Sequence, residues 1–192
     1  MNVLNEIIEK ATYLIINGGW IFGFTLVMIE SFIPILPLGA FVALNTNAFG
    51  FVNALLISWS ATVIGSYLMF LLCRYISNKY IFKLLSKKTK NKLLKKIDLF
   101  KEIKFTQLVL IITVPFTPSC FINLLAGISN ISKEKYISSL IIGKAFMITF
   151  WAFIGKSFIE SITNIKAIIY ILIILIIAYL ISKFISKKYD IE

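Results

Sequence analysis

Pro34-Ile-Leu-Pro37 and Pro115-Phe-Thr-Pro118 are two proline pairs with the same spacing, and both lie deep inside uncharged stretches of the chain. Proline has no backbone N–H and frees the carbonyl one turn earlier, so each pair breaks a helix and leaves polar backbone groups unpaired. Lipid cannot satisfy such groups, and broken helices persist in a membrane only where protein buries them or where they line a watery cavity. The two pairs therefore predict two helix breaks that face a shared polar site.

The composition predicts an all-α integral membrane protein. The chain has 192 residues, of which 59% are hydrophobic, more than the roughly half that is usual in soluble domains. A helix needs about 20 apolar residues to cross a hydrocarbon core about 30 Å thick. We therefore interpret residues 1–192 as one membrane domain, with single transmembrane helices expected at 11–29, 51–73, 136–155 and 164–182.

Positive charge is concentrated in one connecting segment, residues 74–104. This segment holds eleven basic residues against Asp98 and Glu102, a net +9 of the +11 of the whole chain. The positive-inside rule makes it cytoplasmic. Its apolar residues recur with a spacing of three and four, which predicts an amphipathic helix: Leu93, Ile97, Phe100 and Ile103. Such a helix lies either on anionic lipid headgroups or in solvent as a linker.

The charge rule also bears on the second proline pair, within the uncharged residues 105–132. If this stretch crossed the membrane once, Lys133, Lys135 and the basic C-terminal tail would all lie outside, against the rule. We therefore expect 105–132 to turn back as a re-entrant hairpin, and 30–49 to do the same from the other side. Each hairpin precedes a transmembrane helix, so the two units form an inverted repeat. Both termini are then expected in the cytoplasm.

Five polar residues are candidates for binding or coupling. Glu30 is a carboxylate within an otherwise apolar tract, suited to carry a proton or to face a cationic headgroup, unless it is solvated at the interface. Lys144, inside its span, either binds phosphate or extends to the interface, and Arg74 either holds a phosphate or anchors its helix. Asn45 and Asn123 follow the proline pairs, and we expect them to pair with backbone groups that the prolines free.

Several of these residues resemble a known family. The run from Glu30 to Pro37, Gly65-Ser-Tyr, and Pro115-Phe-Thr-Pro-Ser-Cys-Phe-Ile-Asn-Leu-Leu-Ala-Gly127 are similar to motifs of the DedA superfamily, or VTT-domain proteins. The resemblance implies lipid transport and two facing re-entrant hairpins, formed here by Pro34, Pro37, Pro115, Pro118 and Gly127. The chain departs from DedA proteins proper at Leu38-Gly39, where a second acidic residue is usual, and at Ile112, near the usual arginines.

Other classes of function are excluded or disfavoured by residue content. The chain has no histidine, and its aspartates are Asp98 and Asp190 alone, so we expect no enzyme, metal site or cofactor. We predict a flippase-like or scramblase-like transporter in the cell membrane, which moves phospholipid or polyprenyl-phosphate headgroups. The alternative is a membrane organiser that recruits a partner without transport. The expected partners are anionic phospholipids or lipid phosphates and not nucleic acid, and a homo-oligomer is compatible with the sequence.

Overall fold

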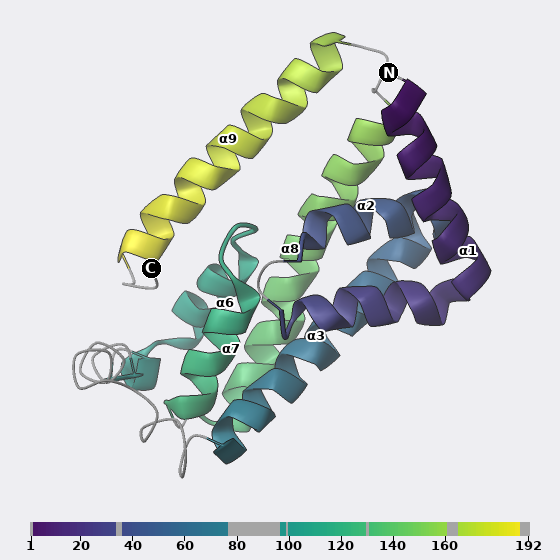
Figure 1. The fold of residues 1–192 in the computed structure, drawn as a ribbon. Helices are drawn as coiled ribbons and strands as arrows, with labels where there is room; N and C mark the ends of the chain where they lie inside the picture. The colour runs from purple at the N-terminus through teal and green to yellow at the C-terminus, as the bar shows by residue number, and fades with distance from the viewer. Residues whose placement is uncertain are drawn as a thin grey trace.

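The computed structural model describes residues 2–33, 36–76, 97–98, 100–129, 131–160 and 165–188. Within these residues the structure contains helices and no strand, which confirms the all-α prediction. Figure 1 shows their arrangement, and the helices are α1 (Asn2–Glu30), α2 (Leu38–Phe49), α3 (Phe51–Ile76), α6 (Phe105–Thr113), α7 (Ser119–Ile128), α8 (Lys133–Glu160) and α9 (Ile165–Lys188).

Three of these helices are long and apolar enough to cross a membrane. The qualifying stretches are Glu9–Glu30 in α1, Phe51–Ile76 in α3 and Lys133–Gly155 in α8. The predicted spans 51–73 and 136–155 lie inside α3 and α8. The predicted span 164–182 overlaps α9, whose apolar part is a shorter stretch, Ile169–Ile185, so that span stays a prediction.

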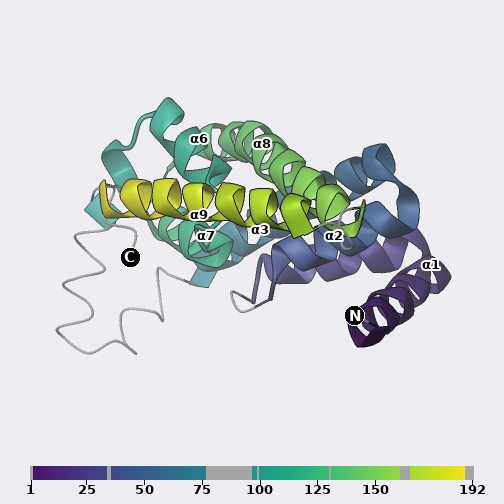
Figure 2. The ribbon, with the colours of Figure 1, turned by 90° about the horizontal axis from the view of Figure 1, so that it is seen from above.

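α1 is bent, although the predicted span 11–29 lies inside it. Gly19 has φ 65° and ψ −174°, a conformation that is open almost only to glycine because it has no β-carbon. The two parts of α1, residues 2–18 and 20–30, therefore run in different directions, as Figures 1 and 2 show. A run of apolar residues reports the length of a helix but not its direction, so hydropathy alone did not predict this bend.

Both proline pairs interrupt helices as predicted. After α1 ends at Glu30, the chain turns through a hydrogen bond from Ser31 N to Met28 O of 3.1 Å, and α2 begins after Pro37. Pro34 lies outside the described residues. In the second half α6 ends at Thr113 and α7 begins after Pro118. Proline is tolerated at the start of a helix because the first turn has no intrahelical partner for its N–H groups.

The long helices α3 and α8 contact each other, and the shorter helices pack on both of them. α1 contacts α3, and α6 contacts α8, while α2 reaches across to α8 and α7 to α3. The apolar core forms two clusters, one around Phe70 and Leu125 and the other around Val42 and Ile148. α9 packs against α8 and is the outermost helix on one side of the bundle (Figures 1 and 2).

The described end of the basic segment is amphipathic, but its apolar face is covered by protein. Ile97, Phe100 and Ile103 are buried, and the last two join the core cluster around Phe70. Asp98, with the charged residues 101 and 102, is exposed. For these residues the hypothesis of a helix that lies on lipid headgroups is therefore wrong, because the apolar face that would enter the lipid packs against the protein. Leu93 and the rest of 77–96 lie outside the described residues.

Candidate functional site

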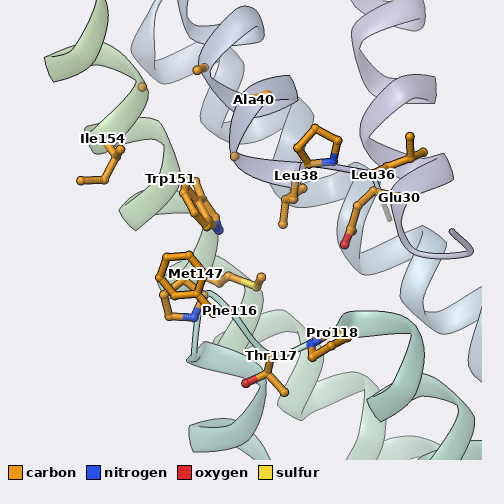
Figure 3. A pocket seen from close by; sticks show the side chains of 15 residues that line it. Glu30, Leu36, Leu38, Ala40, Phe116, Thr117, Pro118, Met147, Trp151 and Ile154 are labelled. Carbon is orange, nitrogen blue, oxygen red and sulfur yellow. The ribbon is translucent and has the colours of Figure 1, made fainter. Parts of the chain in front are cut away.

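A cavity of about 480 Å³ lies between the two proline breaks. Its size falls within the range of roughly 300–1,000 Å³ that is usual for ligand sites. It is bordered by the end of α1, the start of α2, the loop between α6 and α7, and one face of α8, as Figure 3 shows. The lining residues include four that the sequence singled out: Glu30, Pro37, Pro115 and Pro118.

Glu30 places a buried carboxylate in this cavity. Its side chain is 6% exposed, and its carboxylate points from the end of α1 toward the space between α2 and the second break (Figure 3). Oε2 has no hydrogen-bond partner among the described residues. The interpretation of Glu30 as a solvated interface residue is therefore wrong. A buried carboxylate oxygen without a partner is costly, which is typical of a site that a ligand or a proton completes.

Two further lining residues have buried polar atoms without partners. The described part of the chain has four buried polar side-chain atoms without a hydrogen-bond partner. Three of them belong to residues that line the cavity: Glu30 Oε2, Thr117 Oγ1 and Trp151 Nε1. The sequence reasoning missed Thr117 and Trp151. Thr117 lies inside the second proline motif, and Trp151 lies seven residues after Lys144, on the same face of a helix. The position of Thr117 in the proline motif and the helical spacing of Trp151 from Lys144 could have identified these two residues from the sequence.

Trp151 is held in place by its neighbours. Its ring makes edge contacts with the rings of Phe116 and Phe150, each at 5.4 Å between centroids. Gly39 of α2 lies directly against it, since a β-carbon at that position would come within 2.5 Å of the indole ring. The indole is therefore fixed with its N–H on the cavity side (Figure 3).

Both short helices α2 and α7 begin at the cavity. Their N-cap residues, Pro37 and Pro118, line it, and neither offers a side-chain hydrogen bond to the first turn. The first N–H groups of a helix lack intrahelical partners and carry the positive end of the helix dipole. The part of the cavity beside the starts of α2 and α7 therefore favours negative charge or hydrogen-bond acceptors.

Lys144 is buried behind the start of α7. It is 2% exposed, and its Nζ donates to Ser119 Oγ at 2.7 Å and contacts Met147 Sδ at 3.7 Å. The interpretation in which its ammonium extends to the membrane interface is therefore wrong. Lys144 does not line the cavity, but Ser119 directly follows the lining residue Pro118.

Asn45 and Asn123 lie away from the cavity and connect helices. Asn45 Nδ2 donates to Gly23 O at 3.3 Å and to Ser58 Oγ at 3.1 Å. Asn123 Nδ2 donates to Ser31 O at 3.4 Å, in the turn after α1, and its Oδ1 accepts from the Tyr136 hydroxyl at 2.5 Å. The sequence predicted pairing with backbone groups that the prolines free, whereas the observed partners lie in other segments of the chain, namely α1, α3, α8 and the turn after α1.

Arg74 and Gly127 also lie outside the cavity. Arg74 donates to Ile131 O, and its guanidinium stacks over the Phe70 ring at 4.8 Å. A β-carbon at Gly127 would come within 2.7 Å of Phe70 O, so glycine allows α7 to approach α3 closely. These residues hold the second half together at the end of the molecule where α3 ends and α8 begins (Figure 1).

The two halves of the chain repeat some of these contacts at the same spacing. Asn45 and Ser58 are 13 residues apart, and so are Asn123 and Tyr136. Gly65 of α3 lies against the Met28 carbonyl of α1, and Gly143 of α8 lies against α6. Similar contacts thus connect α1, α2 and α3 in the first half and α6, α7 and α8 in the second.

Long apolar helices, two broken segments and a mostly apolar cavity that contains one carboxylate define an α-helical membrane protein with an internal site. A model of the VTT domain matches residues 36–157. The chain belongs to this family, also called the DedA family, whose members are membrane proteins commonly linked to transport. The match contains most of the cavity lining, whereas Glu30 precedes it.

Two curated relatives come from Bacillus subtilis. The uncharacterized membrane protein YhjE is 36% identical over 154 residues, which cover 79% of this chain and 73% of YhjE. The uncharacterized protein YqeD is 27% identical over 162 residues, which cover 83% of this chain and 76% of YqeD. No solved structure matches the chain significantly.

Proposed function

We propose that this protein transports lipids, passing phospholipid or polyprenyl-phosphate headgroups through the cavity while the acyl chains stay in the bilayer. One observation carries the proposal: the unpartnered polar atoms of Glu30, Thr117 and Trp151 line one cavity between two helix breaks. A charged headgroup in hydrocarbon is costly. Polar groups fixed along the route of the headgroup lower this free-energy cost, so transport needs no ATP hydrolysis.

The proposed topology uses the two broken segments as facing re-entrant hairpins. The first hairpin comprises residues 20–49 rather than 30–49, because the bend at Gly19 separates residues 20–30 from the N-terminal part of α1. The second comprises 105–132. Each is followed by a helix long enough to span, α3 or α8. The repeated asparagine contacts support an inverted repeat.

Orientation in the cell membrane follows from the basic segment after α3, which we place in the cytoplasm. The N-terminal end of α1 lies at the opposite end of the molecule, the same end at which α8 ends and α9 begins (Figure 1). We therefore revise the sequence-based expectation for the N-terminus and place it on the outer side. The C-terminal end of α9 runs back toward the cytoplasmic end.

The candidate residues take different roles in this proposal. Glu30 contacts the headgroup, and Lys144 adds positive charge behind the start of α7. Asn45, Asn123 and the prolines shape the hairpins, with Gly127 allowing close packing. Arg74 anchors the cytoplasmic end of α3.

The alternative is a membrane organiser without transport, which loses support only at the described end of the basic segment. It relied on an amphipathic basic helix free to bind lipid or a partner, yet Ile97, Phe100 and Ile103 are buried in the protein.

The test uses purified full-length protein in liposomes that contain trace phospholipid labelled on an acyl chain. Dithionite added outside bleaches only the outer leaflet, so transport appears as bleaching beyond about half of the signal. We expect faster bleaching with protein than without, and a slower rate for Gly39→Val, which pushes on Trp151 and narrows the cavity. Glu134→Gln, at an exposed position in the first turn of α8, is the matched surface control. A rate equal to that of empty vesicles would overturn the proposal.

A further inference from the structure

We propose that α9 is a lateral gate of the cavity, which moves away from the loop between α6 and α7 (residues 114–118) so that acyl chains pass between the cavity and the bilayer. The inference rests on the proposed lipid transport and names the helix that controls access for the acyl chains. It is carried by an aromatic contact between α9 and the cavity wall, and by the narrow seam along which α9 touches the rest of the protein.

Phe116 connects the wall of the cavity to α9. It lines the cavity, where its ring meets that of Trp151 at 5.4 Å between centroids. The same ring meets that of Tyr179 in α9 at 5.9 Å, again in an edge arrangement. Among the described residues of α9, none lines the cavity itself. Phe116 is thus the point at which α9 touches the cavity wall.

The loop that carries Phe116 is held mainly by side-chain packing. Pro115 and Pro118 have no N–H to donate, and the turn is closed by a hydrogen bond of 3.4 Å from Thr117 N to Val114 O, which is long for its kind. Seen from above, α9 runs across the bundle from the side of α2 to the side of α6 and α7 (Figure 2). A movement of α9 therefore removes a support from a part of the wall that is not helical.

α9 touches the rest of the protein along one stripe. Among its described residues Ile171 and Ser182 are buried, and half-buried residues continue the same spacing of three and four: Leu175, Ala178 and Ile185. This spacing corresponds to one face of a helix. The remaining faces expose large apolar side chains: Ile169, Tyr170, Leu172, Ile173, Ile174, Ile176, Ile177, Tyr179, Leu180, Ile181 and Phe184. α9 therefore presents a surface that suits acyl chains on every side.

The contacts that hold α9 are of a kind that lipid can replace. Among the described residues no hydrogen bond or ion pair joins α9 to another helix. The inner helices, in contrast, are linked by buried asparagines, Asn45 to Ser58 and Asn123 to Tyr136. In a bilayer the hydrophobic effect does not drive helices together, because acyl chains are as apolar as the helix surfaces. Separation of α9 from the loop therefore costs little free energy, while the inner helices stay together.

The opened seam would suit an acyl chain better than a water-soluble solute. Apolar side chains lie on both of its walls, with Ala178 and Tyr179 on α9 and Phe116 on the loop. The cavity surface beyond Phe116 is also mostly apolar and includes Met147 and Ile154. A polar solute would lose its hydration along such a path without gaining hydrogen bonds. The seam thus matches the hydrocarbon part of a lipid.

The experiment joins α9 to the loop in the full-length protein. Phe116→Cys and Tyr179→Cys are introduced together, with Cys73 and Cys120 changed to alanine, and a short bismaleimide links the two thiols. Liposomes with this protein and an acyl-labelled phospholipid are then bleached with dithionite. We expect the linked protein to move lipid no faster than empty vesicles do, and the same protein without the linker to remain active.

The matched control carries its link within α9. Tyr170→Cys and Ile174→Cys are both exposed and lie one turn apart, so the same reagent joins them without attaching α9 to the loop. This protein should keep its rate after linking. An undiminished rate in the linked Phe116 and Tyr179 protein would overturn the gate.

A second variant loosens the gate instead of closing it. Tyr179→Ala removes the ring contact with Phe116, and the loss of one aromatic pair should speed transport about two- to tenfold. Tyr170→Ala, exposed on the same helix, should leave the rate unchanged. A slower or equal rate for Tyr179→Ala would mean that Tyr179 only supports the wall, and would overturn the gate. If the double-cysteine protein fails to fold, this comparison still decides the question.

The outcomes distinguish this inference from the function on which it rests. Transport that survives the link between α9 and the loop would overturn the inference and leave lipid transport standing. Rates no higher than those of empty vesicles for the unchanged protein would overturn both.

Discussion

The two halves of the molecule share their hydrogen-bonded framework and differ in their charges. In each half an asparagine after the proline break pairs with a residue 13 positions later, Ser58 in the first half and Tyr136 in the second. The buried charges are not shared in this way, because Glu30 belongs to the first half and Lys144 to the second. Counting from the paired asparagines, the position that matches Lys144 is Ser66. Each charge therefore has no counterpart in the other half, and the repeated asparagine contact requires neither of them.

The first prediction tests whether the halves are oppositely oriented, and its expected effect is all or none. Single cysteines would replace the exposed residues Asn17, Asn53, Lys104 or Ser132, with both native cysteines changed to alanine. A maleimide that cannot cross the membrane should label Asn17→Cys and Asn53→Cys in whole cells. Lys104→Cys and Ser132→Cys should react only after the cells are opened.

The pair Lys104 and Ser132 is the decisive control, because it brackets the second hairpin. Reaction of one but not the other in whole cells would mean that 105–132 crosses the membrane, and the comparison between the halves would fail. Labelling at Asn17 only in opened cells would instead return the N-terminus to the cytoplasm.

The second prediction concerns the charge in the second half. Lys144→Met replaces a buried ammonium that has no acidic partner within 4.0 Å among the described residues. Lys144 and Glu30 are close enough to attract each other, so this change leaves a buried carboxylate without its opposite charge and should lower the free energy of unfolding, by about 3 kcal/mol. Transport should fall at the same time. Unfolding in mixed detergent micelles and the liposome assay measure the two effects.

The corresponding change in the first half is Ser66→Ala, which should alter both quantities little. Loss of stability in Lys144→Met together with unchanged transport would show that Lys144 belongs to the framework and not to the site.

The third prediction compares the two asparagines and has the smallest expected effect. Asn123→Ala leaves the buried Tyr136 hydroxyl and the Ser31 carbonyl without their partner, at a cost of about 2 kcal/mol. Asn45→Ala should cost about 1 kcal/mol, because it also removes the unpartnered Asn45 Oδ1. Detergent unfolding of both variants measures the difference, and Asn53→Ala, exposed on α3, is the control. A larger loss for Asn45→Ala would contradict this explanation.

The sequence predicted those features that depend on local chemistry. Proline pairs marked both helix breaks, and the length of the apolar runs marked α3 and α8. The bend at Gly19 was not predicted, because hydropathy reports only how many apolar residues follow one another. The sequence also left open what covers Phe100, since an amphipathic pattern is the same whether lipid or protein packs on it.

The site was predicted less completely than the fold. Glu30 stood out because a carboxylate is rare in an apolar tract, and its burial was settled only by the structure. Thr117 and Trp151 have residue types that are ordinary in membrane helices. What makes them notable is the missing hydrogen-bond partner of each, which depends on contacts between distant segments.

The shortness of three helices has a consequence for the surrounding bilayer. α2, α6 and α7 have 12, 9 and 10 residues, so at about 1.5 Å per residue each extends no more than about 18 Å. The hydrocarbon layer is about 30 Å thick, so none of them can bridge it. If they enter from opposite sides as proposed, they end near its middle. A travelling headgroup would then meet two half-thickness barriers in series instead of one full-thickness barrier.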